Sequence, residues 1–251
     1  MSTLFYLSSA QMDVIRPFFP RSRGIPRKDD QKIISGIIHV LKFGLRWKDA
    51  PKEYGPYKTL YNRFVRWSNM GVFEKIFTAL SESTQDTSLL MIDATCLKAH
   101  RTAASLRKKG FSSRCIGRTK GGLNTKLHVV CDSDGRPIRT LLTAGTISDY
   151  GGAAYLLPTL PSTRMLLADR CYDAGWIRSF LKNRGCTPCI PSRKNAKSQE
   201  YYDKKQYRQR HKIENMFSRL KDWRRIATRY DCCAHTFLSA IHLAAIVIFY
   251  L

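Results

Sequence analysis

Two short apolar runs in the sequence each end on an aspartate. The run Leu89–Ile92 leads into Asp93, and the run Met165–Ala168 leads into Asp169. Apolar runs of this length are typical of buried strands, and a carboxylate at a strand end lies where side chains converge at a sheet edge. A buried carboxylate is costly unless it is paired or binds a metal ion. The two runs therefore predict a pair of acids with a chemical role.

A third acid, Glu214, lies in a basic helical segment. Tyr207, Arg210, Glu214 and Lys221 stand at offsets of 0, 3, 7 and 14 residues, which places them close to one stripe of a helix. An acid on a stripe with Arg and Lys is compatible with an ordinary helix salt bridge, worth about 0.2–0.5 kcal/mol. If the helix instead packs against the strand ends, Glu214 completes a cluster of three carboxylates.

Three converging carboxylates repel one another, and hard divalent cations relieve this repulsion. If Glu214 joins the two aspartates, we expect Asp93, Asp169 and Glu214 to be the catalytic residues and the ligands of two divalent ions, Mg²⁺ with Mn²⁺ as the alternative. Two such ions about 3.5–4 Å apart activate an attacking oxygen and stabilise the leaving one in phosphodiester chemistry. The two cations of the stripe are expected to contact phosphate, and its tyrosine to hydrogen-bond or stack nearby.

The net charge of the chain indicates which kind of molecule it binds. The 251 residues include 43 Lys and Arg against 19 Asp and Glu, a net charge of +24. Such a chain calls for a polyanion, either nucleic acid or an anionic membrane. The start carries no signal-peptide pattern, and the apolar tail 237–251 is too short to span a bilayer. The sequence predicts a cytoplasmic protein with nucleic acid as its partner, and its cysteines are expected to be small hydrophobic residues rather than zinc ligands.

Residues 1–86 are expected to form a small all-helical domain. Helix-start signals at Ser8 and Asp29 precede apolar residues at helical spacing, and a basic amphipathic helix is expected over Tyr57–Met70. Several short helices with one basic member suggest a helix-turn-helix-like DNA-binding unit, with Arg63 and Arg66 as contacts. A plain helical bundle stays open, because the local net charge is only +6.

Residues 87–251 show an α/β pattern. Apolar runs predict five strands, at residues 89–93, 126–131, 137–143, 165–169 and 187–191. Helical stretches are expected at residues 151–160, 173–184 and 200–227. A mixed five-stranded sheet with helices in this order matches the ribonuclease H-like fold.

A strongly basic stretch follows the first acid. Lys98–Lys126 holds nine Lys and Arg and no acid, and its glycines predict a flexible loop. Contacts from such a loop to the phosphate backbone supply affinity rather than sequence choice. The expected DNA contacts here are Lys98, His100, Arg101, Arg118, Lys120 and Lys126.

The segment Tyr207-x2-Arg210-x3-Glu214-x6-Lys221 resembles the signature around the catalytic glutamate of DDE transposases of bacterial insertion sequences, in insertion-sequence family five. Met91–Thr95 resembles the first catalytic strand of this family, and Leu167–Asp173 resembles its second aspartate motif. Gly44–Pro51 is similar to part of the family's helical DNA-binding module. One departure is Cys171, where many relatives carry Gly or Ala.

The resemblance implies an endonuclease that frees 3′ hydroxyls at the ends of a transposable element and joins them to target DNA. It implies a homodimer assembled on paired terminal inverted repeats. Two alternatives stay open at this point. One is a related metal-dependent nuclease that cuts without joining, and the other is an inactive DNA-binding remnant that acts as a repressor.

Overall fold

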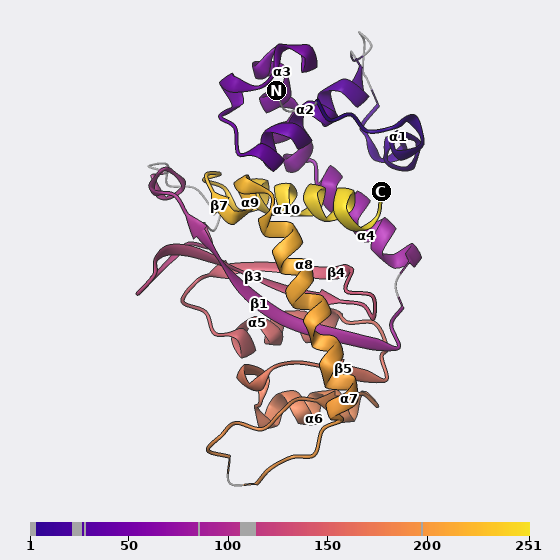
Figure 1. The fold of residues 1–251 in the computed structure, drawn as a ribbon, viewed down its shortest axis with the longest axis vertical. Helices are drawn as coiled ribbons and strands as arrows, with labels where there is room; N and C mark the ends of the chain where they lie inside the picture. Colours follow the sequence, from indigo (N-terminus) through magenta and orange to yellow (C-terminus); the bar gives the residue numbers. More distant parts are fainter. Residues whose placement is uncertain (1–3, 22–26, 28, 85, 106–113, 197) are drawn as a thin grey trace. The chain divides into compact units, whose positions relative to one another are not determined.

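A computed structural model describes most of the chain as two compact units (Figure 1). The described residues are 4–21, 27, 29–84, 86–105, 114–196 and 198–251. The helical unit comprises the described residues of Met1–Leu80, His100–Ser113 and Leu220–Leu251. The sheet unit comprises those of Ser81–Ala99 and Arg114–Arg219.

The N-terminal helices begin where the cap residues predicted. They are α1 (Ser9–Ile15), α2 (Asp30–Phe43), α3 (Tyr57–Asn69) and α4 (Val72–Thr84). Ser8 and Gln11 form a capping box, in which each side chain accepts a hydrogen bond from the other residue's backbone N–H. Asp29 accepts one from the N–H of Lys32 at the start of α2. Local sequence signals therefore set the starts of these two helices.

The C-terminal segment belongs to the same unit as these helices. Its elements are α9 (Arg224–Ala227), the two-residue strand β7 (Thr228–Arg229) and α10 (Ala234–Phe249). His242 of α10 stacks on Phe77 of α4, with ring centroids 4.7 Å apart. The Arg225 guanidinium donates to the carbonyl of Leu45 over 3.0 Å.

The contacts therefore divide the chain differently from its composition. The expected boundary at residue 86 follows the change in sequence pattern, whereas the contacts group the last helix with the first ones, because α10 is apolar around most of its surface and is buried. Within the described ranges, no helix is long and apolar enough to cross a membrane.

The sheet unit contains a mixed sheet. Its strands are β1 (Leu89–Ala99), β2 (Gly117–Thr119), β3 (Gly122–Cys131), β4 (Pro137–Ala144), β5 (Met165–Leu167) and β6 (Thr187–Cys189). β1 pairs antiparallel with β3 and parallel with β5, and β5 pairs parallel with β6. The other edge of β3 carries both β2 and β4. All five predicted strands are confirmed, and the short strand β2 is an addition to the predicted five-stranded sheet. The buried Cys186 and Cys189 lie beside and within β6, as expected of small hydrophobic residues, whereas Cys96 and Cys171 are exposed and do not fit that expectation.

The prediction of one flexible loop over Lys98–Lys126 is wrong for most of its described part. β1 continues to Ala99, and its ladder with β3 reaches Lys98 opposite Asn124. The β2–β3 hairpin then turns at Gly122, whose φ of 93° favours glycine. Residues 106–113, with Gly110 of the predicted loop, lie outside the described residues.

Helices cover the two faces of this sheet. They are α5 (Asp149–Leu156), α6 (Gly175–Asn183), α7 (Lys204–Tyr207) and α8 (His211–Lys221). Leu90 and Ile92 of β1 share a buried cluster with residues of α5 and α6. Side chains alternate along a strand, so Asp93 leaves β1 on the opposite face, where it meets the turn (Arg208–Arg210) that joins α7 to α8. The predicted helix over 200–227 is therefore divided, with a break between α8 and α9.

Buried His242 predicts a pH dependence of stability. Burial lowers the pKa of this imidazole to about 3, from about 6.5 when it is exposed. Below pH 6.5, His242 is protonated in the unfolded chain but stays neutral in the folded protein. The contribution of neutral His242 to the free energy of unfolding is therefore complete above pH 6.5 and declines as the pH falls. We expect urea unfolding of wild type to lose about 2 kcal/mol more than His242→Phe between pH 7.5 and pH 5. Parallel stability profiles of the two proteins would contradict the assignment.

Candidate active site

Asp93 and Asp169 lie at the same level of two neighbouring parallel strands. β1 and β5 pair with Met91 opposite Leu167, and each aspartate follows two residues later. Neighbouring strands lie about 4.8 Å apart, so the two acids leave the sheet side by side. The structure thus brings together the two aspartates on which the apolar runs end.

Asp93 is a largely buried carboxylate, and each of its oxygens accepts a hydrogen bond. Its side chain is 15% exposed. Its Oδ1 accepts a hydrogen bond from the N–H of Ala94 over 2.8 Å, and its Oδ2 accepts one from Nη1 of Arg210 over 2.7 Å. Burial raises the pKa of Asp93, the charge of Arg210 opposes that rise, and the charge of Asp169 adds to it. This position therefore favours a nearby cation.

Asp169 is held by the turn that follows it. Its Oδ1 accepts a hydrogen bond from the N–H of Cys171 over 2.8 Å and so caps the turn Arg170–Tyr172. Burial raises the pKa of the Cys171 thiol, and the charge of Asp169 raises it further. A protonated thiol suits the expected role of Cys171 as a small tolerated residue.

One guanidinium joins the strand acid to the helix acid. Arg210 donates from Nη1 to Asp93 and from Nη2 to Oε1 of Glu214, over 2.7 and 2.6 Å. The Arg210 side chain is 16% exposed, whereas that of Glu214 is 57% exposed. The helix salt bridge considered for Glu214 is therefore present, and the same arginine also ties this helix to Asp93.

The expected cluster of three carboxylates is not assembled. Among the described residues, no group of three His, Cys, Asp or Glu side chains is placed to hold a metal ion. Carboxylates repel one another at close range, and the guanidinium of Arg210 stands between two of them as the compensating charge. The donors themselves are hard oxygen ligands of the kind that Mg²⁺ and Mn²⁺ prefer, so the residues suit divalent ions once Arg210 exchanges its partners.

The other two members of the stripe differ in position. Burial raises the pKa of Tyr207, the charge of Arg210 lowers it and that of Asp169 raises it. Lys221 is the last residue of α8 and belongs to the helical unit. Its contact to phosphate stays a prediction.

Two further residues of this region were not singled out by sequence reasoning. Asp149, in the first turn of α5, accepts a hydrogen bond from Nζ of Lys126 over 2.9 Å. Tyr172 is 1% exposed, and its hydroxyl has no hydrogen-bond partner within the described part of the chain. Burial raises the pKa of Tyr172 most, and the charges of Asp93, Asp149 and Asp169 raise it further. The residue lies in the turn that Asp169 caps. Asp149 follows a helix-capping serine and resembles an ordinary helix start, which hides it in the sequence.

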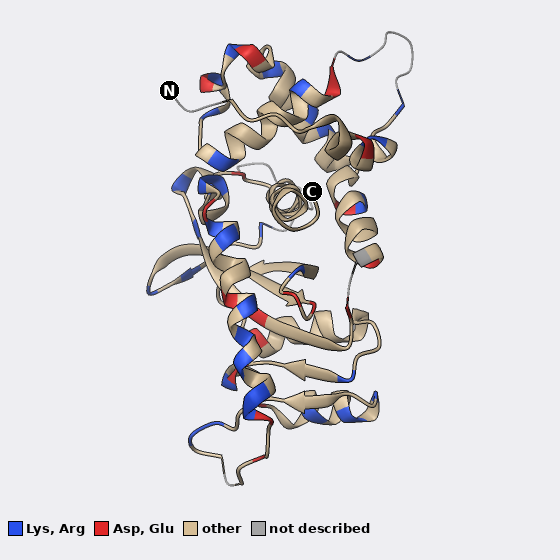
Figure 2. Cartoon of the chain, turned by 45° about the vertical axis from the view of Figure 1, so that its right-hand side comes forward, with Lys and Arg blue, Asp and Glu red and all other residues tan. Residues whose placement is uncertain are grey.

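The expected DNA contacts divide into exposed and engaged side chains. Figure 2 shows basic positions recurring along α7 and α8, with acidic positions among them. The exposed candidates are Arg66, Lys98, Arg101, Arg118 and Lys120. Lys126 is bonded to Asp149, while Arg63 bonds Asp30 over 2.6 Å and lies over the ring of Trp67. The imidazole of His100 meets the hydroxyl of Thr102 over 2.9 Å. Arg63 thus also stabilises its unit, and DNA contact by each of these residues stays a prediction.

The buried ion pair between Arg210 and Asp93 predicts an effect of Arg210 on the stability of the folded protein. Replacing Arg210 by Met leaves Asp93 buried without a cation, so we expect Arg210→Met to lower the free energy of unfolding by about 2 kcal/mol. The double variant Asp93→Asn/Arg210→Met should recover much of this loss, because a neutral amide tolerates burial better. Arg16→Met removes an exposed ion pair and should cost under about 1 kcal/mol. Equal losses in urea unfolding of Arg210→Met and Arg16→Met would refute the bridge.

Comparison with known proteins agrees with this geometry. Residues 7–77 match a family model described as a putative transposase of the IS4/5 family, and residues 84–249 match the transposase DDE domain. A cryo-EM structure of the piggyBac transposase synaptic complex with hairpin DNA is similar over 97% of this chain and 72% of its own, with a TM-score of 0.52 and 10% identity. That likeness concerns the fold and, with the mixed sheet, confirms the ribonuclease H-like prediction.

Two relatives carry transposase names. The putative transposase for insertion sequence element IS6501 of Brucella ovis is 36% identical over 127 residues, which are 50% of this chain and 98% of that protein. The putative transposase for insertion sequence element IS402 of Burkholderia cepacia is 30% identical over 125 residues, 40% of this chain and 59% of that protein. Since the DDE-domain model alone matches more than half of the sequence, the chain belongs to the IS4/5-type family of DDE transposases.

Proposed function

We propose that the chain cleaves DNA at the ends of its insertion sequence and joins the freed 3′ hydroxyls to target DNA. Asp93, Asp169 and Glu214 are the catalytic acids and hold two divalent ions, Mg²⁺ or Mn²⁺. The observation that carries this assignment is the level pairing of Asp93 and Asp169 on parallel strands, with Arg210 linking Asp93 to Glu214. When bound, such ions activate the attacking oxygen and stabilise the leaving one.

The chain's own residues prepare the site for this reaction. The Ala94 and Cys171 amides fix the carboxylates of the two aspartates in place. Arg210 supplies positive charge until the acids take other partners, and it is then free to contact phosphate. The exposed lysines and arginines of β1 and the β2–β3 hairpin hold the DNA backbone, which gives affinity with a strong salt dependence.

Two DNA ends call for two active sites, so we propose a homodimer on paired terminal inverted repeats. It acts on chromosomal DNA in the cytoplasm of the bacterium, without a membrane partner. A nuclease that cuts but does not join has the same acids, and a strand-transfer assay with 3′-hydroxyl ends separates it from a transposase. A repressor remnant is disfavoured because all three acids are present.

Removing any of the acids tests the assignment. We expect Asp93→Ala, Asp169→Ala and Glu214→Ala each to lower Mg²⁺-dependent nicking of a terminal-repeat duplex and strand transfer by roughly a thousandfold or more. Binding to the terminal repeat, measured by fluorescence anisotropy, should stay within about twofold, because DNA affinity comes mainly from the basic residues. The exposed Glu200 offers a matched control, and Glu200→Ala should behave as wild type. Wild-type-like joining by Asp169→Ala would sink the assignment.

The substitution Tyr172→Phe tests whether this residue has a structural or a functional role. Its buried hydroxyl has no partner among the described residues, so a purely structural account makes Tyr172→Phe neutral or stabilising, by up to about 1 kcal/mol. We expect this unchanged or higher stability together with about tenfold slower nicking, because Tyr172 lies in the turn that Asp169 caps and its hydroxyl is left to hydrogen-bond to groups bound there. Wild-type nicking by Tyr172→Phe would remove the residue from the site.

A further inference from the structure

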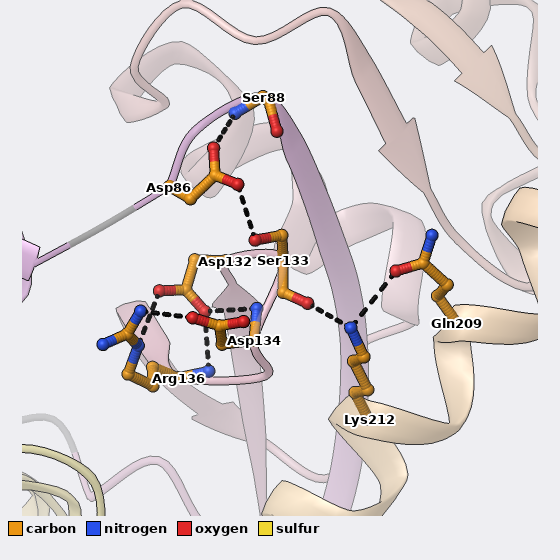
Figure 3. Close-up of polar contacts among 8 residues, drawn as sticks. All are labelled: Asp86, Ser88, Asp132, Ser133, Asp134, Arg136, Gln209 and Lys212. Carbon is orange, nitrogen blue, oxygen red and sulfur yellow. Dashed lines mark hydrogen bonds and ion pairs between the residues drawn. The ribbon is translucent and has the colours of Figure 1, made fainter.

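The turn between β3 and β4 touches α8 two residues before Glu214 (Figure 3). Lys212 donates from Nζ to the carbonyl of Ser133 over 2.6 Å and to Oε1 of Gln209 over 3.2 Å. A Cβ on Gly135 would lie 3.1 Å from both the Cβ and the carbonyl oxygen of Lys212. Gly135 also has a φ of 80°, which favours glycine. The turn therefore meets the helix backbone directly, and any side chain at Gly135 pushes against it.

A buried carboxylate organises the turn through hydrogen bonds. Asp132 is 0% exposed and accepts hydrogen bonds from the N–H of Asp134 over 3.0 Å and from the N–H of Arg136 over 2.8 Å. Nε of Arg136 donates to the same carboxylate over 3.1 Å, and Arg136 also pairs with Asp134. Burial raises the pKa of Asp132, and the bonds from Arg136 oppose that rise. A buried carboxylate with three donors fixes the turn in one conformation.

The same turn is tied to the start of β1. The hydroxyl of Ser133 donates to Oδ2 of Asp86 over 2.8 Å, and Oδ1 of Asp86 accepts from the N–H of Ser88 over 2.9 Å. Ser88 directly precedes β1, the strand that carries Asp93. Figure 3 shows this chain of contacts running from Asp86 through the turn to Lys212.

We propose that Asp86, Asp132, Ser133, Gly135 and Lys212 form a brace that positions the helix of Glu214 relative to the strand of Asp93. The inference rests on the proposed function of those two acids. Arg210 links the same two elements, but its bonds go to the carboxylates themselves, for which any bound cation competes. The brace contacts neither carboxylate. It therefore holds α8 in register while the partners of Arg210 change.

Two substitutions open the brace. Lys212→Met removes the bond to Ser133 while keeping most of the side-chain stem, and Gly135→Ala pushes the turn from the helix. We expect amide hydrogen exchange across residues 213–220 of α8 to become at least about tenfold faster in the protein without metal or DNA. At saturating terminal-repeat DNA, we expect the Mg²⁺ concentration for half-maximal nicking to rise about tenfold, the lower end of the effect of removing groups that orient metal ligands. The maximal rate at high Mg²⁺ should change less than threefold.

Matched variants separate positioning from general destabilisation. Gly185→Ala carries a comparable backbone strain, at φ 69°, but has nothing within 4 Å of its added Cβ. Lys205→Met removes an exposed lysine of α7 and controls for the lost charge. Both controls should keep wild-type exchange in α8 and the wild-type Mg²⁺ requirement. Lys212→Arg, which retains a donor, should restore most of both.

The two readouts fail in different ways. If Lys212→Met and Gly135→Ala leave exchange in α8 and the Mg²⁺ requirement as in the controls, the brace is overturned. Faster exchange with an unchanged Mg²⁺ requirement makes the turn a structural support only and also overturns the positioning role. If the wild-type protein itself neither nicks nor joins DNA, the proposed function fails, and exchange in α8 alone then decides whether the turn holds the helix.

Discussion

The site depends on compensation of negative charge where the sheet and a helix meet. Two parallel strands deliver Asp93 and Asp169 side by side, and burial makes an unpaired carboxylate there costly. Arg210 supplies the compensating charge and extends it to Glu214. The negative charge of these carboxylates requires a nearby cation, and a site that binds divalent metal ions needs this property.

The fold fixes the three acids to different degrees. Hydrogen bonds along the β1–β5 ladder set the two aspartates, and backbone amides hold their carboxylates. Glu214 is mostly exposed and its place depends on how its helix is held. The apolar face of α8 buries Ile213 and Met216. The hydrogen bond from Lys212 to the carbonyl of Ser133 adds a directional contact to this packing.

The other basic residues fall into two groups, those held in ion pairs within a unit and the exposed ones that we propose contact DNA. Arg63, Arg136 and Arg178 are committed to ion pairs inside their units, so they add to the net charge of +24 without offering a free cation. The exposed Lys98, Arg118 and Lys120 lie on β1 and on the adjoining β2–β3 hairpin, which stand in place of the predicted loop. A positive patch built on strands presents its charges at fixed spacing, which suits the regular phosphates of a duplex.

Local signals in the sequence determined the helix starts at Ser8 and Asp29, the five main strands and the two aspartates that end apolar runs, because caps and periodicity act over a few residues. The helical stripe of Tyr207, Arg210 and Glu214 could also be identified from the sequence, but the sequence did not show that it contacts Asp93. Only the tertiary structure decided that Arg210 reaches Asp93, that Tyr172 and Asp149 lie near the acids, and that α10 packs with the first helices. These contacts join residues far apart in the chain, and which pairs meet depends on burial of the whole surface rather than on any local pattern.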